Sequence, residues 1–382
     1  MSEIAEPAVL VMHKGGKTLR GSERCTIENI AGLQERGVRV ILAANNPDVI
    51  VGNLAVAPAL VIPVEYPEIM FDEGLRLPVH RYLAQLRKLH RAAVSWHPSL
   101  VVAGGGLPCQ LGLPLARWLR APIVCQFHHA AARRFLYFWL LPWVDRFITP
   151  SRHTHDILLA RVRRESTVVP LGTDTEGTFR VLPRDPAWRA RLGIAADTMV
   201  VAQVGALVPH KGADTLIRAV ASLRARGLAA HGLIIGDGPA RGGVEQLIAE
   251  VAPQAVTLLG RVSEVAPYLQ HVADVHVLPS AEEGFGLAVI EAAGCGLPNV
   301  VAVPGALGEI VRDGVDGVHI PARNVERLAG ALEGLYQDPE RRRAMGRAAA
   351  ARALEEFSVG AYRTRMAEEL IATIDAPERR RV

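Results

Sequence analysis

The sequence predicts an α/β protein made of two doubly wound domains, each with its own parallel sheet. Short apolar runs alternate with longer amphipathic stretches along most of the chain, which is typical of strands and helices in succession. The alternation stops at a stretch rich in proline and charge, residues 181–198, and then begins again. The length of 382 residues also suits two domains, because single cores stop growing at about 250–300 residues.

The first half contains a series of apolar runs of strand length. The run at residues 8–13 is followed by a loop that contains glycines and then by a helical pattern from about residue 21 to residue 36. Helical patterns fill most of the later gaps, which is the βαβ order of a parallel sheet. The other predicted strands lie at residues 38–44, 59–64, 99–104, 122–127, 145–150 and 166–170.

The second half repeats this order and ends in helices from Asn324 onward. We predict an N-terminal domain over residues 1–182, a C-terminal domain over residues 183–360, and a last helix over residues 361–382 that packs back on the first domain. Ligands of such sheets bind beyond the carboxyl ends of the strands, so two facing sheets would hold a site in the cleft between them. The predicted strands lie at residues 199–205, 231–238, 255–260, 273–279, 298–303 and 317–321.

Composition and charge exclude several classes of protein. Residues 1–180 carry 21 Lys and Arg against 15 Asp and Glu, a net charge of +6, and the remainder carries −2. This mild basic excess fits an anionic ligand or a membrane surface but is too weak for nucleic-acid binding. The four cysteines show no CxxC spacing, so we expect no disulfide framework or zinc site and a reducing cytoplasm. The acidic N-terminus leads straight into a strand and is not a signal peptide, and the longest apolar run, residues 135–144, is too short to span a bilayer.

The stretch "PSAEEGFGLAVIEAAGCGLP", residues 279–298, places Glu283 and Glu291 on either side of a predicted helix start at residue 284 or 285. The N–H groups of a first helical turn have no partner inside the helix, and glycines let an anion approach them. On a helix the two acids would lie about 12 Å apart along the axis, which is the reach of an extended nucleotide-diphosphate sugar. For two acids alone, dipole compensation and solvation are the simpler interpretation.

Four other blocks accompany this stretch in a fixed order. They are "VVPLGTDTEGTF" at residues 168–179, "VGALVPHKGADTLIRAV" at 204–220, "LIIGDGP" at 233–239 and "VTLLGRVS" at 256–263. Together the five blocks resemble glycosyltransferase family 4, whose E-x7-E signature matches the pair of glutamates. The resemblance covers roughly half of the chain. It implies the GT-B fold, in which two Rossmann-like domains face each other across a cleft, and a retaining transfer.

The resemblance also implies roles for individual residues. Glu283 would orient the donor sugar, Lys211 would neutralise the leaving diphosphate, and Glu291 would bind the ribose. The sequence has no Asp-x-Asp pair, so backbone amides and Lys211 would act without a metal. The donor would be a sugar nucleotide of the UDP or GDP type, with no other cofactor. The full set of donor-binding residues is Gly21, Gly205, Lys211, Gly236, Arg261, Val262, Phe285, Gly286, Leu287 and Glu291.

The first domain resembles the family more loosely. In residues 13–42 the position of Gly21 matches a glycine whose N–H meets the donor's distal phosphate, although a plain β–α turn is an equal alternative. In "VCQFHHA", residues 124–130, His128 matches a histidine that lines the catalytic pocket. Adjacent residues at a strand end point in opposite directions, so only one of His128 and His129 should face the site.

Ala206 departs from the family pattern, which usually has an arginine directly after the "VG" of the Lys211 block. The resemblance therefore supplies one phosphate-binding cation where two are expected. Three alternatives stay open. His210 or the basic loop at residues 14–20 compensates, the donor binds weakly, or the enzyme is atypical.

The stretch "RRFLYFWLLPWVDRF", residues 133–147, is rich in aromatic side chains. It either reaches a membrane interface or forms a core-facing helix packed on the first sheet. The sequence as a whole predicts a cytoplasmic hexosyltransferase, with the inner face of a membrane as an alternative location. Its acceptor would be a glycan, a lipid-linked molecule or a small molecule in polysaccharide or glycoconjugate synthesis. The alternatives are a sugar-nucleotide epimerase of similar fold and a non-catalytic partner that binds nucleotide sugars, which Ala206 alone favours.

Overall fold

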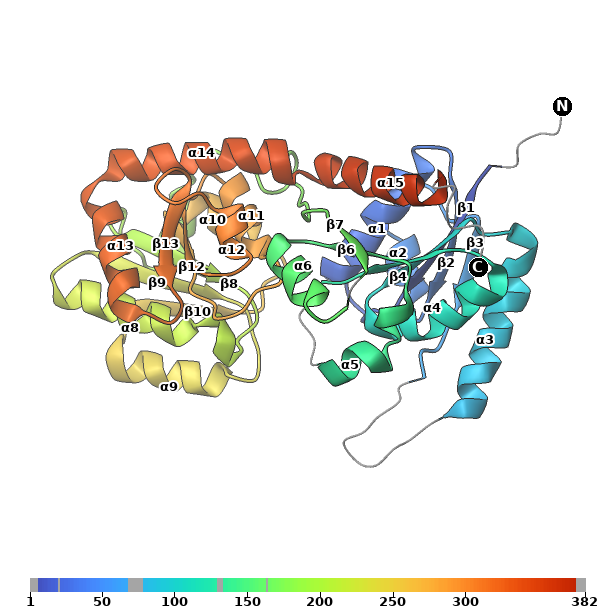
Figure 1. Ribbon diagram of the computed structural model, residues 1–382. Coiled ribbons are helices and arrows are strands. Elements are labelled where there is room, and N and C mark those ends of the chain that lie inside the picture. Colours follow the sequence, from blue (N-terminus) through green and yellow to red (C-terminus); the bar gives the residue numbers. More distant parts are fainter. Residues whose placement is uncertain (1–5, 20, 68–77, 129–132, 163, 376–382) are drawn as a thin grey trace. The chain divides into compact units, whose positions relative to one another are not determined.

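The structure, a computed structural model, describes residues 6–19, 21–67, 78–128, 133–162 and 164–375 and divides into two compact units (Figure 1). Unit 1 comprises Met1–Leu171 and Tyr362–Val382, and unit 2 comprises Gly172–Ala361. The division lies before residue 182, the predicted end of the first domain. Residues 172–182 belong to unit 2 because Thr173 pairs with Ser358 and Phe179 is buried in the core of that unit.

Unit 1 is built on a seven-stranded parallel sheet with the order β3-β2-β1-β4-β5-β6-β7. From β1 the chain adds β2 and β3 on one side of the sheet and β4 to β7 on the other. Ligands of doubly wound sheets bind at this switch point, next to β1 and β4. Every apolar run predicted in this half forms one of the strands. The strands are β1 (Ala8–His13), β2 (Arg39–Ala44), β3 (Leu60–Pro63), β4 (Leu100–Gly104), β5 (Ile123–Gln126), β6 (Arg146–Thr149) and β7 (Glu165–Val168).

Helices cover the sheet of unit 1 and join its strands (Figure 1). They are α1 (Gly21–Gln34), α2 (Pro47–Val51), α3 (Val79–Ala93), α4 (Gly106–Leu119), α5 (Arg133–Phe138) and α6 (Arg152–Leu159), with short 3₁₀ turns at Val94–Trp96 and Leu141–Trp143. Residues 133–147, for which a core-facing helix was one of two alternatives, form α5, a 3₁₀ turn and the start of β6, and the left-handed backbone of Leu140 separates the first two.

Unit 2 contains a six-stranded parallel sheet with the order β10-β9-β8-β11-β12-β13. The predicted runs of the second half again form its strands, so the prediction of two doubly wound α/β domains is confirmed. The strands are β8 (Met199–Val204), β9 (Ala230–Ile235), β10 (Val256–Gly260), β11 (Val275–Leu278), β12 (Asn299–Val303) and β13 (Gly317–Pro321). The helices are α7 (Ala187–Arg191), α8 (Ala213–Ala225), α9 (Arg241–Val251), α10 (Ala266–His271), α11 (Leu287–Gly294), α12 (Leu307–Ile310), α13 (Val325–Gln337) and α14 (Pro339–Phe357), with a 3₁₀ turn at Pro209–Lys211.

Burial on both faces explains why these strands read as continuous apolar runs. In β8, Met199 and Val201 belong to one core cluster, whereas Val200 and Ala202 belong to a second. Successive strand residues point to opposite faces, so the two clusters lie on opposite sides of the sheet. A parallel sheet covered by helices on both faces favours apolar side chains at successive positions, and most strand residues here are apolar.

The C-terminal helix α15 (Val359–Asp375) packs against α1 of unit 1. Tyr362 is fully buried, and its hydroxyl donates a 2.8 Å hydrogen bond to Asn29 Oδ1. Arg363 Nη2 donates to Glu28 Oε2 at 2.6 Å. These bonds join positions more than 300 residues apart in the chain, and α15 belongs to the first unit from Tyr362 onward.

Unit 2 should lose stability in acid because His276 of β11 is buried as a neutral imidazole. Its Nδ1 lies 2.7 Å from Asn299 Oδ1, and burial lowers its pKa from 6.5 to about 4. The unfolded chain binds this proton more readily, so the stability contribution is complete above pH 6.5 and is lost as the pH falls toward 4. We expect a loss of about 3 kcal/mol at most.

Urea unfolding of the wild type and of His276→Gln at pH 7 and pH 4.5 tests this prediction. The variant should lose less stability on acidification than the wild type, because the group that titrates has been removed. An equal loss in the two proteins would show that His276 does not carry the effect.

Candidate functional site at the carboxyl edge of the second sheet

Two loops of unit 2 meet beyond the carboxyl ends of β8 and β11 and bring Lys211 and Glu283 together. The Lys211 ammonium forms an ion pair with Glu283 Oε1, and the two side chains are 22% and 10% exposed. Low exposure strengthens such a pair, because less water screens the charges. Lys211 and Glu283 are 72 residues apart in the sequence, and the sheet topology makes them neighbours.

Hydrogen bonds fix the positions of both loops. The Ala281 N–H donates to the His210 carbonyl oxygen at 2.8 Å, and the Ser280 hydroxyl donates to the same oxygen at 3.1 Å. From below, the buried Gln203 side chain of β8 donates to the Lys211 carbonyl oxygen at 2.8 Å. These hydrogen bonds hold the backbone at His210 and Lys211 in place, so the Lys211 side chain extends from a fixed position.

Glycines allow the loops after β8 and β9 to touch through their backbones. Gly236 follows β9 with a φ of +148°, and a Cβ there would overlap the Gly205 carbonyl oxygen. A Cβ on Gly238 would similarly overlap the backbone of Leu207. Two of the predicted donor residues, Gly205 and Gly236, thus lie side by side at the edge that holds Lys211.

The helix that carries Glu291 begins later than predicted. Residue 284 or 285 was expected to open it, but α11 begins at Leu287 after Gly286, whose φ of +117° lies outside the helical region. Glu283 is therefore not on the helix, and Glu291 lies about one turn inside it. The predicted spacing of about 12 Å along a shared axis does not apply. The first-turn amides that could meet an anion begin at Leu287.

The other predicted donor residues take different positions around this edge. The Phe285 ring is buried against Phe357, with ring centroids 6.1 Å apart, so only its backbone can meet a ligand. Arg261 is exposed directly after β10, and Val262 packs partly on the core. Ala206 is exposed directly after Gly205, so a longer side chain would have room there.

A second polar cluster lies at the carboxyl end of β1 in unit 1, and the sequence did not predict it. The buried Glu23 of α1 accepts a 2.8 Å hydrogen bond from the Gly16 N–H and lies 3.7 Å from His13 Nε2. Asn45 Oδ1 accepts a 2.9 Å bond from the Gly15 N–H. A Cβ on Gly15 would overlap Glu23 and His13, so these groups close around the glycine loop. An acidic residue just inside the helix after a glycine loop was the available signal.

Burial shapes the charges of this cluster. Burial alone would raise the pKa of Glu23, but hydrogen bonds from backbone N–H groups and from Ser22 hold it below the ordinary value. Burial lowers the pKa of His13 despite the neighbouring Glu23. At neutral pH the loop therefore packs on a glutamate anion and a neutral imidazole.

Gly21 and His128 occupy the same unit as this cluster. Gly21 is the first residue of α1, and His128 follows β5 by two residues and is half-buried. His129, the alternative to His128, and Arg20 of the basic loop lie outside the described residues. In the part of the chain that the structure describes, no group of three or more His, Cys, Asp or Glu side chains could hold a metal ion. The same residues contain no helix that is both long and apolar enough to cross a membrane.

Comparison with known protein families agrees with this fold. Residues 184–352 match the family described as "Glycosyl transferases group 1", and residues 19–177 match "Glycosyltransferase Family 4". The two matches occupy most of both units. The chain belongs to glycosyltransferase family 4. The assignment confirms the predicted family, and four of the five sequence blocks lie, with the site at the second sheet, within the group 1 match.

Several curated proteins are related to this family 4 chain. The D-inositol 3-phosphate glycosyltransferase of Mycobacterium marinum is 39% identical over 180 residues, 44% of this chain and 37% of the relative. A GDP-mannose-dependent alpha-(1-6)-phosphatidylinositol monomannoside mannosyltransferase of Mycolicibacterium smegmatis is 34% identical over 215 residues, 53% of this chain and 55% of the relative. The matched segment thus spans about a third to about a half of the relatives' lengths.

Solved structures of similar fold cover nearly the whole chain. Anabaena Alr3699/HepE in complex with UDP-glucose superposes with a TM-score of 0.80 at 21% identity and covers 96% of this chain and 99% of its own. The likeness confirms the GT-B type of two-domain α/β fold for this family 4 member.

Proposed function

We propose that the chain transfers a hexose-type sugar from a nucleotide-diphosphate sugar to an acceptor hydroxyl with retention of the anomeric configuration. The observation that carries the proposal is the Lys211–Glu283 pair beside the start of α11. A cation and a set of first-turn amides at one sheet edge suit a diphosphate leaving group, and a neighbouring carboxylate suits sugar hydroxyls. Family 4 membership adds the reaction class.

In this proposal the diphosphate takes up negative charge as its bond to the anomeric carbon breaks. Lys211 and the amides from Leu287 onward stabilise that charge, which lowers the barrier most when the donors are already in place. The hydrogen bonds that frame residues 210–211 supply this preorganisation. A diphosphate at the start of α11 would share the ammonium with Glu283, whose carboxylate then turns to the donor sugar. No metal is part of the proposal.

The remaining predicted residues complete the proposed site. Glu291 binds the ribose hydroxyls, and the segment with Arg261 and Val262 meets the base. Gly205 and Gly236 let the donor approach the backbone. In unit 1, His128 contacts the reacting sugar and the Gly21 amide contacts the distal phosphate. UDP- and GDP-type donors both have support, since one related structure holds UDP-glucose and one relative is named as GDP-mannose-dependent.

The acceptor is proposed to be a glycan, a lipid-linked molecule or a small molecule of cell-surface polysaccharide or glycoconjugate synthesis. One feature of unit 1 favours an acceptor with an apolar part. A pocket of about 340 Å³ is lined by apolar and aromatic side chains that include Tyr82, Tyr137 and Phe138.

Tyr137 and Trp143 are 46% and 49% exposed and meet edge to face, which supports a peripheral contact of residues 133–147 with the inner face of a membrane.

The test is incubation with a panel of UDP- and GDP-sugars, with and without acceptor glycans, while the release of free nucleoside diphosphate is followed. We expect turnover or a thermal shift with at least one donor, and NMR of the product should show the retained anomeric configuration. If no donor gave either turnover or a thermal shift, the result would contradict the proposal. Conversion of the donor sugar without any acceptor would instead indicate an epimerase.

An arginine at position 206 should strengthen donor binding. Ala206 is exposed beside Gly205, so the Ala206→Arg side chain can reach a phosphate at this edge, and a charge-assisted hydrogen bond there is worth about 1.5–3 kcal/mol. We expect the Kd of the nucleoside diphosphate to fall by about tenfold or more. Isothermal titration checks the value, with Ala206→Gln as the uncharged control. Equal affinities for the arginine and glutamine variants would place the phosphates elsewhere.

A further inference from the structure

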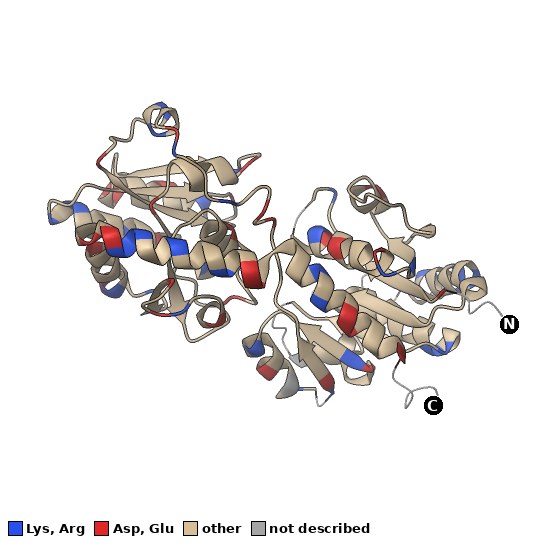
Figure 2. Cartoon of the chain, turned by 90° about the horizontal axis from the view of Figure 1, so that it is seen from above, with Lys and Arg blue, Asp and Glu red and all other residues tan. Residues whose placement is uncertain are grey.

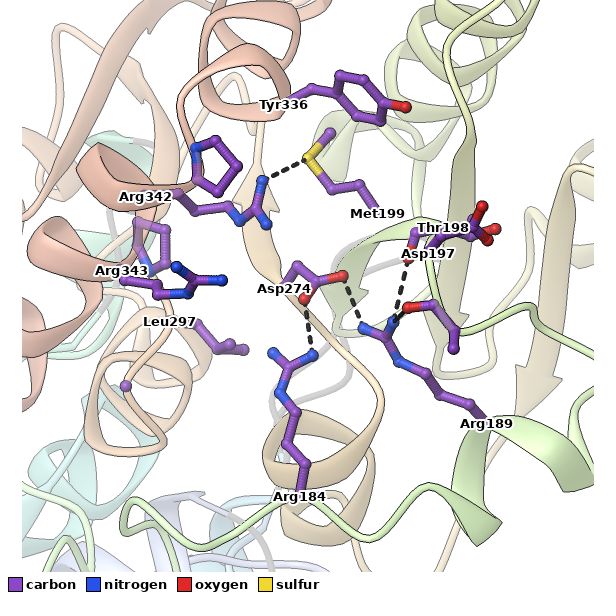
Figure 3. Close-up of a pocket in the computed structure, with 14 residues that line it drawn as sticks. Arg184, Arg189, Asp197, Thr198, Met199, Asp274, Leu297, Tyr336, Arg342 and Arg343 are labelled. Carbon is purple, nitrogen blue, oxygen red and sulfur yellow. Dashed lines mark hydrogen bonds and ion pairs between the residues drawn. The ribbon is translucent and has the colours of Figure 1, made fainter.

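A pocket of about 660 Å³ lies in unit 2 at the amino ends of the strands (Figure 3). Its floor is formed by residues that come just before or at the start of β8, β11 and β12, namely Met199, Asp274 and Pro298. The segment that contains α7 and the first turn of α14 form its walls. All of these residues belong to one compact unit.

This pocket is separate from the candidate donor site. Lys211 and Glu283 follow the carboxyl ends of β8 and β11, whereas Met199 and Asp274 precede or open the same strands. The six residues of β8 span roughly 17–20 Å at the rise of an extended strand. A ligand of ordinary size cannot occupy both positions.

Arginine side chains converge on the pocket from three directions (Figure 3). Arg189 is 8% exposed and donates to the Val272 carbonyl oxygen and to Asp274 Oδ2, both at 2.7 Å. Arg184 donates to Asp274 Oδ1 at 2.7 Å. The carboxylate of Asp274 is thus matched by two guanidinium groups. Four arginines and two aspartates, Asp197 and Asp274, line the pocket, so its lining has an excess of positive charge. Acidic and basic residues are otherwise mixed along the ribbon (Figure 2).

Arg342 of α14 brings a further guanidinium to the pocket. Its Nη1 donates to the Leu335 carbonyl oxygen at 2.7 Å and lies 3.7 Å from the Met199 sulfur. Among the described residues, no ion pair joins Arg342 to a carboxylate, and no hydrogen bond uses its Nε or Nη2. Burial and then the charges of the neighbouring arginines lower the pKa of Arg342 against the opposing effect of Asp274. A bound anion would relieve this repulsion.

We propose that this pocket is a second anion site, which binds the phosphate or diphosphate group of a small phosphorylated compound. A guanidinium presents its N–H groups in a planar fork that matches phosphate oxygens, and the side chains of Arg342 and Arg184 reach the pocket from opposite walls. The volume suits a ligand of nucleotide or sugar-phosphate size. Such a ligand would tie α14 to the segment around α7, so the site is suited to regulating the donor domain. The inference stands independently of the proposed function.

Pyrophosphate titration tests the site. The donor edge also attracts phosphates, so all proteins in this experiment carry Lys211→Ala. Isothermal titration calorimetry compares three of them: Lys211→Ala alone, Lys211→Ala with Arg342→Gln, and Lys211→Ala with Arg347→Gln. Arg347 is exposed on the same helix and does not line the pocket, which makes it the matched control. We expect the first and third proteins to bind alike and Arg342→Gln to bind about tenfold more weakly or worse. Equal affinity in all three, or no binding in the millimolar range, would overturn the proposal.

Three further measurements test the result. Thermal unfolding without ligand shows whether Arg342→Gln remains folded, and Arg184→Gln is the replacement if it does not. Hydrogen exchange with pyrophosphate should slow the exchange of amides in α7 and the first turn of α14, and slowing confined to residues 205–212 and 283–291 would contradict the location. Flotation with vesicles that contain phosphatidic acid, compared with neutral vesicles, distinguishes a lipid phosphate from a soluble one. Binding of pyrophosphate, or of vesicles that contain phosphatidic acid, supports the phosphate site if Arg342→Gln weakens it.

Discussion

Replacement of Lys211 by alanine is expected to lower kcat/KM for the sugar nucleotide by about 10²–10³-fold. The change removes the described cation that pairs with Glu283 at this sheet edge, and the diphosphate then leaves without it. Because a fixed cation acts most strongly on charge that develops in the transition state, kcat should fall as well as affinity. Steady-state kinetics with the donor found in the panel measures both.

Two variants make this result specific. Arg218→Ala removes an exposed cation from α8, the helix that follows the Lys211 loop, and should leave kcat/KM unchanged. Glu283→Gln keeps the size of the carboxylate but ends the ion pair, so it separates the loss of the pair from the loss of the ammonium. If Lys211→Ala and Arg218→Ala had the same kcat/KM, Lys211 would not act on the diphosphate.

Replacement of Gly236 by alanine is expected to destabilise unit 2 by about 3 kcal/mol or more. The added Cβ would overlap the Gly205 carbonyl oxygen, which is backbone and cannot rotate away, and the φ of +148° is strained for any other residue. Relief requires the loops after β8 and β9 to separate, and that movement would also displace the Lys211 loop. Urea unfolding should therefore show a lower midpoint, and donor affinity should fall with it.

Gly242→Ala is the matched control for this change. Gly242 lies inside α9, and a Cβ there meets no atom within 4 Å. Alanine is favoured over glycine in a helix by about 0.5–1 kcal/mol, so this variant should be slightly more stable than the wild type. A small effect of Gly236→Ala, similar in size to that of Gly242→Ala, would mean that the two loops do not press together as described.

The fold could be predicted from the sequence because the parallel strands are buried on both faces. Most of their side chains are apolar, so most strands stand out from the helices around them, as the burial of Met199 through Ala202 on two faces illustrates. The start of α11 could not be placed in the same way. The sequence alone does not show the backbone angle of Gly286, and that angle places the start of the helix at Leu287, two or three residues later than predicted.

The candidate site was predictable as a set of residues but not as a set of contacts. Lys211 and Glu283 each stand in a motif, whereas their pairing depends on β8 and β11 being neighbours in the sheet. The cluster of His13 and Glu23 and the arginine pocket have no motif of their own. Arg184 and Arg342 come from segments far apart in the chain, and no local spacing connects them. Tertiary structure alone assembles such groups.

A crystal structure with the nucleotide sugar, or with its nucleoside diphosphate, tests the central claim most directly. The account predicts the diphosphate within hydrogen-bond distance of Lys211 and of the first amides of α11, with the ribose at Glu291 and the sugar near Glu283. A diphosphate bound instead at the amino ends of the strands, among Arg184 and Arg342, would contradict the assignment of the donor site.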